Sequence, residues 1–436
     1  MNRILLAAGL VLAFGMAAWN TGAADAEPAH PTPQYIFFHV AYTDPDPEMR
    51  WVQHDPDSFS RDLFDDLVNK IDRVENEDLE IGLSFSFSLL QDPVDVLLES
   101  LEALLELSEE TGIPVQINVD GQNWWGNRPD LWNWWDPDKP GYDPDNRYNV
   151  EWTDWDPDSA IKIGWRDWGH QIRVRPEPNL MSPAVREATL DALRPMAAAT
   201  AEWWRDLPEE DKHLLGGFRV GWETSIGVNA YHYPDGNRYY EQWPDDASHD
   251  PTHGRDHEAG YFGGLAPLGH AALKTAGIKT SGEITPGDIA EVVHRYLAEL
   301  SETAHEEGLP KHLLFTHQGG TYEPWEKHLP FWPAINEWAT PGWSFYGVDP
   351  EDPPGLAQAM DARGRERWAA VEWWWGAPDA AGWREHFERT LGWKDCRFVT
   401  VFNWNQGMFR EDPAGLQAVH DLLHNYEAPA PSRQQR

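Results

Sequence analysis

Two glutamates stand where strand-forming sequence rarely holds a charge. Glu223 ends the run "GGFRVGWE", and Glu372 lies in "RWAAVEWWWG", directly before three tryptophans. Glutamate is a poor strand former, and its charge is costly to bury without a partner. A carboxyl in such surroundings is suited to proton transfer or to attack on an electrophilic carbon. We take both as candidate catalytic residues; for Glu223 the structural alternative is a strand-end ion pair with Arg173 or Arg175.

Three more polar residues end strand-like runs. His39 and His317 show no paired metal-ligand spacing, so we expect them to hydrogen bond to a ligand rather than to bind a metal. Asp120 ends "PVQINVD" and is expected either to bind a ligand hydroxyl or to orient a neighbour.

Short β-rich runs alternate with helical patterns over most of the chain. This alternation predicts the α/β class and, with eight strands, a (β/α)₈ TIM barrel. Helix caps support it: Asp92 and Thr285 each precede a proline and an apolar-periodic run, and Gly112 and Gly308 follow those runs. The strands are expected at 35–42, 81–90, 114–120, 216–223, 312–318, 342–349, 367–375 and 397–405.

Two connections, after strands three and four, are too long for plain loops. They run over about 121–181 and 224–283, and both follow carboxyl ends of strands, where barrel enzymes build their sites. The first is rich in tryptophan, and aromatic faces stack on the apolar faces of sugars. We therefore expect a folded wall over the barrel mouth, with some of Trp124, Trp125, Trp134 and Trp135 lining a cleft.

Glu223 and Glu372 end strands four and seven, which face each other across an eight-stranded barrel. One carboxylic acid and one carboxylate facing across a bound sugar are what glycoside hydrolysis requires. This arrangement resembles the clan A retaining glycoside hydrolases, the "4/7" superfamily of (β/α)₈ barrels. The resemblance implies that Glu223 is the acid/base and Glu372 the nucleophile, with Glu223 having the higher pKa.

Two further positions carry the resemblance and one departs from it. Tyr346 in "SFYGVD" is similar to the strand-six tyrosine that hydrogen bonds to the nucleophile, and Trp404 in "FNWN" to the tryptophan that floors the sugar subsite. Clan members usually have Asn before the acid/base to hold the sugar 2-hydroxyl, whereas this chain has Trp222. The remaining Asn-Glu pair, Asn336-Glu337, lies in a poorly placed, proline-interrupted stretch.

Asn405, Asn229 or Gln122 are expected to replace the missing Asn. The residues expected to bind substrate are His39, Asp120, Gln122, Trp124, Trp125, Trp222, Asn229, His317, Tyr346, Trp374, Trp404 and Asn405.

The amino-terminal residues predict export. A basic start, an apolar stretch and small residues make 1–26 resemble a secretory signal, so we expect a secreted or periplasmic product. The barrel is expected over 30–426 and a disordered tail over 427–436. Cys396 is the only cysteine, so no internal disulfide forms.

The formal net charge of −39 makes nucleic acid and anionic membrane poor partners. The repeated "DPD" triplets lack EF-hand spacing and are expected to be turns. No nucleotide-binding or metalloprotease motif occurs in a suitable context, so neither metal nor cofactor is expected, and we expect a monomer.

These observations predict a secreted glycoside hydrolase acting on O-glycosyl bonds of a poly- or oligosaccharide with retention. The alternatives are a non-catalytic carbohydrate-binding barrel, since fold does not imply function, and an inverting hydrolase.

Overall fold

The fold comes from a computed structural model, which describes residues 33–40, 56, 59–162, 164–167, 171–226, 268–319, 329–353, 355–374, 376–404 and 409–428, with backbone only for 165–167 and 171–174. The predicted signal at 1–26 and all but the first two residues of the predicted tail lie outside these ranges. Within them, no helix has both the length and the apolar character needed to cross a bilayer.

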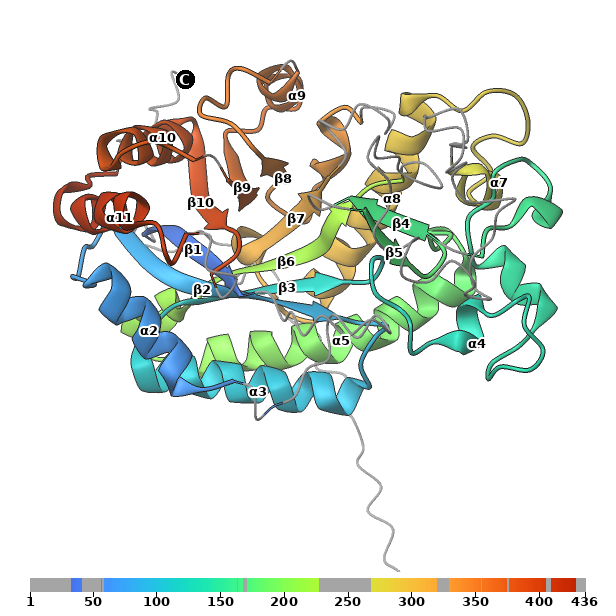
Figure 1. The fold of residues 1–436 in the computed structure, drawn as a ribbon, viewed down its shortest axis with the longest axis horizontal. Coiled ribbons are helices and arrows are strands. Elements are labelled where there is room, and N and C mark those ends of the chain that lie inside the picture. The colour runs from blue at the N-terminus through green and yellow to red at the C-terminus, as the bar shows by residue number, and fades with distance from the viewer. Residues whose placement is uncertain are drawn as a thin grey trace, which may run out of the picture.

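The core of the molecule is a closed barrel of eight parallel strands, in the order β1-β10-β9-β8-β7-β6-β3-β2 (Figure 1). This order confirms the predicted (β/α)₈ barrel. The strands are β1 (Gln34–Val40), β2 (Leu79–Ser88), β3 (Val115–Asp120), β6 (Leu215–Thr224), β7 (Leu314–Gln318), β8 (Gly342–Phe345), β9 (Arg367–Trp373) and β10 (Asp395–Val401).

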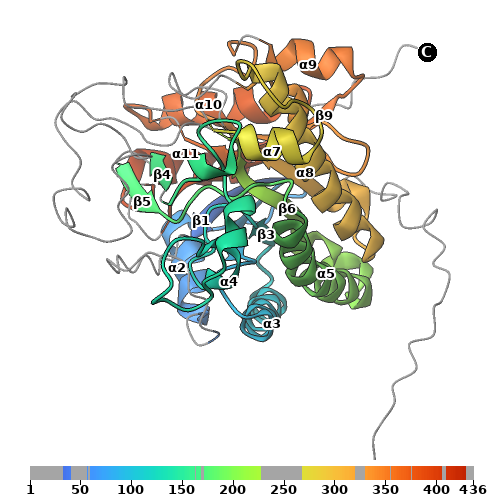
Figure 2. The same ribbon diagram turned by 90° about the vertical axis from the view of Figure 1, so that its right-hand side faces the viewer.

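Helices lie outside the strands and connect most of them (Figures 1 and 2). Between β7 and β8 the described residues form only a 3₁₀ turn, Trp332–Ala334, which includes Pro333. The helices are α2 (Arg61–Ile71), α3 (Val94–Thr111), α5 (Pro183–Asp206), α8 (Pro286–Glu306), α9 (Leu356–Ala362), α10 (Ala380–Gly392) and α11 (Pro413–Asn425).

Local sequence sets the helix ends. Thr285 caps α8 in a capping box with Asp288, in which each side chain accepts a hydrogen bond from the other's backbone. Gly112 ends α3 in the left-handed conformation, at φ 62°. The predicted N-cap of α3 is wrong by one residue, because Pro93 takes that place rather than Asp92.

The segment between β3 and α5 has its own small core. It contains α4 (Pro129–Trp132), 3₁₀ turns at Pro144–Tyr148 and Pro157–Ser159, and an antiparallel pair, β4 (Gly164–Asp167) and β5 (Gln171–Val174). In Figure 1 it lies beyond the arrowheads of β3 and β6, the carboxyl end of the barrel. The long connection after β6 falls mostly on 227–267, outside the described residues, and resumes before α7 (His270–Thr275).

The barrel interior has two layers of different character. Toward the amino ends lies an aromatic and aliphatic cluster, the apolar layer: Tyr35, Phe37, Phe315, Ala369, Val371 and Phe398. Above it lies the polar layer, made of His39, Ser84, Ser86, Gln116, Asn118, Arg219, His317 and Thr400, all buried. The polar layer forms the floor beneath the barrel mouth.

Candidate active site

Glu223 lies at the carboxyl end of β6, where the strand bends. Gly221 and Glu223 have positive φ of 83° and 48°, and the pairing with β7 shifts register between Val220 and Thr224. A β carbon on Gly319, next to this bend, would lie 2.8 Å from the β carbon of Glu223, so a glycine is needed there. Such bulges re-aim side chains and are frequent beside active sites.

Glu372 on β9 also follows a register shift. Val371 belongs to the apolar layer inside the barrel, so strict alternation would turn Glu372 outward. The pairing with β8 shifts between Trp343 and Ser344, the partners of Ala370 and Glu372. Glu372 consequently joins the site, and the next residue, Trp373, is fully buried in the main hydrophobic core.

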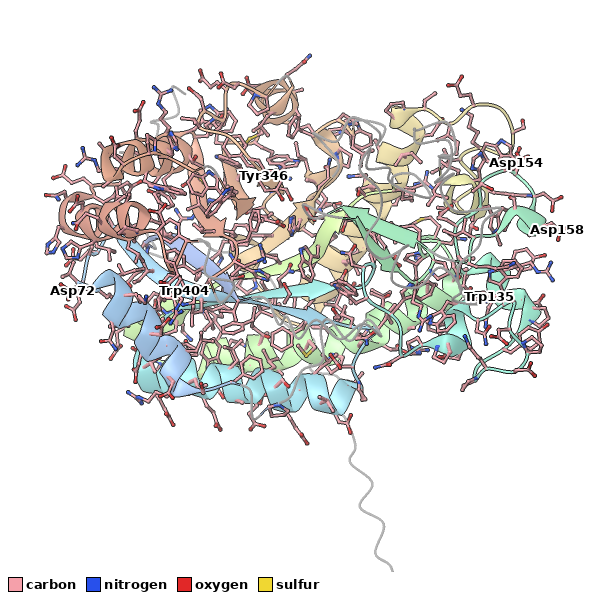
Figure 3. The ribbon with its side chains drawn as sticks, in the orientation of Figure 1. Asp72, Trp135, Asp154, Asp158, Tyr346 and Trp404 are labelled. Atoms are coloured by element: carbon pink, nitrogen blue, oxygen red, sulfur yellow. The ribbon has the colours of Figure 1, made fainter. Side chains whose placement is uncertain are left out.

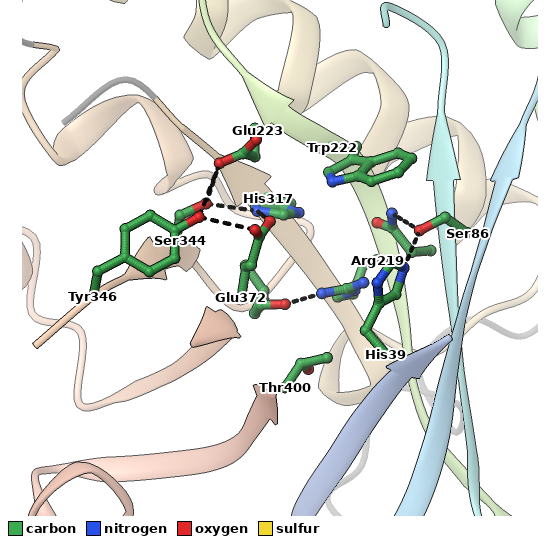
Figure 4. Close-up of polar contacts among 12 residues, drawn as sticks. His39, Ser86, Arg219, Trp222, Glu223, His317, Ser344, Tyr346, Glu372 and Thr400 are labelled. Carbon is green, nitrogen blue, oxygen red and sulfur yellow. Dashed lines mark hydrogen bonds and ion pairs between the residues drawn. The ribbon is translucent and has the colours of Figure 1, made fainter. Parts of the chain in front are cut away.

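One tyrosine joins the two carboxylates. The Tyr346 hydroxyl lies 2.8 Å from Glu372 Oε1 and 3.2 Å from Glu223 Oε1 (Figure 4). Ser344 Oγ lies 3.1 Å from the same Glu223 oxygen. The structure therefore brings together the three residues that the resemblance implied, Glu223, Glu372 and Tyr346, at one site.

The two carboxylates influence each other's protonation. Burial and the charge of Glu223 raise the pKa of Glu372 to about 8, while hydrogen bonds from Tyr346 and Trp222 and the charge of Arg219 act to lower it. Two carboxylates this close share a proton at neutral pH, because ionising both places like charges together. The three lowering influences act on Glu372 in the direction that a nucleophile needs, toward its charged form.

His317 lies behind this pair. Its Nε2 is 3.0 Å from Ser344 Oγ and 3.7 Å from Glu372 Oε2, and its side chain is 1% exposed. Burial, followed by the charge of Arg219, lowers the pKa of His317 well below its usual value. A neutral imidazole with Nε2–H can donate to Ser344, so His317 orients the site. Its side chain is too buried to contact a sugar.

His39 has a similar supporting place. Its Nδ1 lies 2.7 Å from Asn403 Oδ1 and its Nε2 lies 3.0 Å from Ser86 Oγ, which also accepts a hydrogen bond from Asn118. Burial lowers the pKa of His39 to about 4. Both ring nitrogens thus face protein partners, and the predicted contact with substrate is replaced by an orienting role.

Trp222 takes part in the site although it departs from the clan pattern. Its side chain hydrogen bonds to Glu372, and its carbonyl accepts from Asn123 Nδ2 at 2.7 Å. The bend at Gly221 and Glu223 lets two consecutive residues, Trp222 and Glu223, both reach the mouth.

Trp404 does not form the floor of the site. It is 1% exposed, its ring packs 5.0 Å from that of Phe38, and its indole donates to Asp66 Oδ2 of α2 at 3.0 Å. Figure 3 shows Trp404 beside α2, away from Tyr346. The chain turns outward at the end of β10, so the predicted stacking contact is wrong in this structure.

Trp124 and Trp125 are also buried rather than open to a cleft. Trp125 is 1% exposed, donates to the carbonyl of Pro176, and packs in the insert's core with Trp132 and Trp152. Trp124 is 4% exposed. The aromatic content of this segment therefore holds the segment together.

Asp120 and Gln122 position the chain rather than face the mouth. Asp120 accepts hydrogen bonds from the backbone N–H groups of Gln122, Asn123 and Trp124, an arrangement that fits the orienting alternative. Gln122 donates to Glu177 and to the carbonyl of Ser225, just beyond Glu223.

Asn229 and Asn405, the other two candidates for the missing Asn, lie outside the described residues. Asn336 caps a turn by accepting from the backbone of Trp338 and Ala339, and with Glu337 it lines a separate cavity of about 450 Å³ between α8 and the residues after α9. Since Glu223 meets Glu372, the Asn336-Glu337 pair is not needed to complete the site.

Sequence reasoning missed three contributors. Ser344 contacts Glu223, and the ring of Phe402 lies between those of Tyr346 at 5.7 Å and Trp374 at 6.1 Å, so Phe402 and the half-buried Trp374 form an aromatic rim. Arg219, four residues before Glu223, lies inside the barrel, and a cation in the apolar run "GGFRVGWE" was a signal for it.

Within the described ranges, no group of three or more His, Cys, Asp or Glu side chains could hold a metal ion. The site's chemistry is that of two carboxyls, a phenol and buried imidazoles.

Comparison of the sequence with known protein families gives no match, and comparison with well-characterised proteins gives none either. Among solved structures, the chain is similar to an endogalactoceramidase, with a TM-score of 0.37 and 12% identity over 86% of this chain and 71% of that one. It is also similar to a ruminal GH26 endo-beta-1,4-mannanase, with a TM-score of 0.40 and 11% identity over 91% of this chain and 63% of that one. These likenesses are distant, and the barrel assignment rests on the strand order itself.

Proposed function

We propose that this chain is a glycoside hydrolase that cleaves O-glycosyl bonds with retention of anomeric configuration, and that it is exported. The observation that carries the catalytic proposal is the Tyr346 hydroxyl, which contacts Glu223 Oε1 and Glu372 Oε1 across the barrel mouth. The two contacts bound the separation of these oxygens at about 6 Å, which is nearer to the ~5–5.5 Å between the carboxyls of retaining enzymes than to the ~6.5–9.5 Å of inverting ones and so supports retention.

In the first step Glu372 Oε attacks the anomeric carbon while protonated Glu223 gives its proton to the glycosidic oxygen. The carbon–oxygen bond to the leaving group breaks, and a glycosyl ester on Glu372 forms. In the second step Glu223, now a carboxylate, takes a proton from water. The resulting oxygen attacks the same carbon and releases the sugar, which restores both groups.

The surrounding residues fit these roles. Glu372 must be ionised to attack, and Tyr346, Trp222 and Arg219 all favour its charged form. Trp374 and Phe402 offer half-buried aromatic surface on one side of the mouth, as apolar sugar faces require.

Labelling by a mechanism-based inactivator tests this function. A panel of 2,4-dinitrophenyl 2-deoxy-2-fluoro glycosides of glucose, mannose and galactose, mono- and disaccharide, would be incubated with the protein and the peptides mapped. We expect one stoichiometric label on Glu372. A label on another carboxylate contradicts the assignment. Binding of sugars without a label or hydrolysis favours the non-catalytic alternative, and products of inverted configuration favour an inverting hydrolase.

A further inference from the structure

The buried guanidinium of Arg219 has no place in the two chemical steps above, although it lies directly beneath them. Arg219 projects from β6 into the barrel and is 2% exposed. A charge taken this far from water is costly unless an opposite charge lies near it.

The hydrogen bonds of Arg219 cross the barrel to the strand of the nucleophile. Its NH1 donates to the carbonyl of Val371, the residue before Glu372, and its NH2 lies 3.3 Å from Ser84 Oγ on β2. β6 and β9 are separated in the barrel by β7 and β8. Arg219 thus fixes the backbone at Glu372 as well as supplying charge beside it.

The charge balance of the site leaves Glu372 as the counter-ion of Arg219. Among the residues that the structure describes, the titratable groups around Glu372 are Arg219 and Glu223 from β6, His317 from β7 and Tyr346 after β8, with His39 from β1 beside Arg219. The other described groups there are uncharged: Trp222 and Ser344 beside the carboxyls, and the Ser84, Gln116 and Thr400 hydrogen-bond chain below.

Of those five titratable groups, only Arg219 and Glu223 can carry charge near neutral pH, and Glu372 itself is the third such group. Burial lowers the pKa of both histidines and raises that of Tyr346, so all three of these are neutral. That leaves Arg219 and the two glutamates. Burial lowers the pKa of Arg219 to about 9, which keeps it charged at neutral pH, and Glu372 is the partner whose charge opposes that shift. In the described part of the site, one cation therefore faces two carboxyls, and one proton on the carboxyl pair balances the charge at least cost.

We propose that Arg219 is a positioning residue that serves as the permanent counter-ion of Glu372, and that it sets the number of protons held by the carboxylate pair at one. The proposal rests on the proposed hydrolase, for which it supplies the starting protonation state of both steps. Without the cation, the buried pair would hold a second proton at neutral pH and the nucleophile would be lost.

The test measures ionisation of Glu372 directly and does not depend on hydrolysis. Carboxyl-stretch infrared titrations would be recorded for the full chain and for the Arg219→Met, Arg219→Gln and Arg219→Lys variants. Each would be subtracted from its own Glu372→Gln counterpart, so that only protonation linked to Glu372 remains. We expect the midpoint to rise by at least one pH unit in the Met and Gln variants and to stay near the parent's in the Lys variant.

Thr400→Val is the matched control, because Thr400 belongs to the same buried layer, 3.0 Å from Gln116 Oε1, but carries no charge. Its midpoint should equal the parent's. Equal midpoints in the parent and in whichever of Arg219→Met and Arg219→Gln folds would overturn the proposal, as would an equal rise in Thr400→Val. If the midpoints move as expected but no glycoside labels Glu372, the counter-ion role stands and the hydrolase proposal fails.

Discussion

The two layers of the barrel interior fill the same cylinder by different means. In the apolar layer Phe398 contacts the rings of Phe37 at 5.7 Å and Phe315 at 4.6 Å, and Gly216 leaves the space that Phe37 occupies. In the polar layer one cation and a set of hydrogen bonds fill the space beneath Glu372. The apolar layer stabilises the fold by burying apolar surface in close packing. The polar layer buries less apolar surface and instead sets the charge at the mouth of the barrel.

The largest effect on activity is expected from replacing Glu372, the proposed nucleophile above the polar layer. Glu372→Ala should lower turnover roughly 10⁴–10⁶-fold, since the covalent step is lost, while folding is retained. Azide should restore activity by forming a glycosyl azide of inverted configuration, detectable by NMR. Glu223→Ala is the comparison: it should spare the first step for dinitrophenyl glycosides, whose leaving group needs no proton. Near-normal hydrolysis by both variants would exclude this pair.

Truncation in the apolar layer should cost stability instead of altering chemistry. Phe37 is fully buried against Tyr35 and Phe398, so Phe37→Ala should lower the free energy of unfolding by about 3–5 kcal/mol. Denaturant unfolding measures this loss. The pH dependence of whatever activity remains should match the parent's; a shifted pH profile would show that the layers are not separate.

Replacing Glu372 by a neutral residue should change how the free energy of unfolding depends on pH. The pKa of Glu372 is about 8 in the folded protein, above its ordinary value of 4.5, so the folded state holds the proton more tightly. Its contribution to stability is fully present below pH 4.5 and is lost as the pH rises through about 8. Glu372→Gln removes this titration, so the unfolding free energy of the variant relative to that of the parent should rise across this window by about 1–3 kcal/mol. This rise adds to a loss that does not depend on pH, because the variant leaves Arg219 without its counter-ion.

Thermal and denaturant unfolding at several pH values would show this change in the difference between the two proteins. Buried Glu151, whose pKa burial also raises to about 8, is present in both proteins and cancels in the difference. A gap that is constant with pH would mean that Glu372 titrates as an ordinary carboxyl.

The smallest expected effect comes from the phenol that joins the carboxylates. Tyr346→Phe removes a hydrogen bond of 2.8 Å to Glu372, worth about 1–2 kcal/mol to a charged acceptor, and should slow the first step about tenfold. The acidic limb of kcat/KM should move to higher pH, because a donor to the charged form is gone. Ser344→Ala, which affects Glu223, is the comparison, and it should leave that limb in place.

The sequence predicts the barrel well because each strand has a continuous buried run. β6 was expected at 216–223 and is Leu215–Thr224, and Thr285 was expected to begin α8 and is its N-cap. The two glutamates were also legible, because an apolar strand seldom carries a charge unless a site uses it. Local composition was enough for these features.

What the sequence could not show are the departures from strand alternation. The shifts at Gly221 and at Val371 bring Trp222 and Glu372 into the site, whereas simple alternation would have turned each away. The outward turn after β10 removes Trp404 from it. The many tryptophans did not show by themselves which of them lie in a core and which at the site. Trp125 is buried in the core of the segment between β3 and α5, whereas Trp374 is half-buried at the barrel mouth. Such outcomes depend on pairing between distant strands.

Cys396 offers a practical benefit. It is the chain's single thiol, it lies fully buried in β10 with Sγ 3.4 Å from the carbonyl of Phe398, and burial raises its pKa to about 12. A maleimide or methanethiosulfonate reagent would find almost no thiolate there. A cysteine introduced at exposed Tyr142 or Tyr148 would therefore take a fluorophore or spin label selectively, with the native thiol left in place. Distances between such a probe and the barrel could then be followed as oligosaccharides are added.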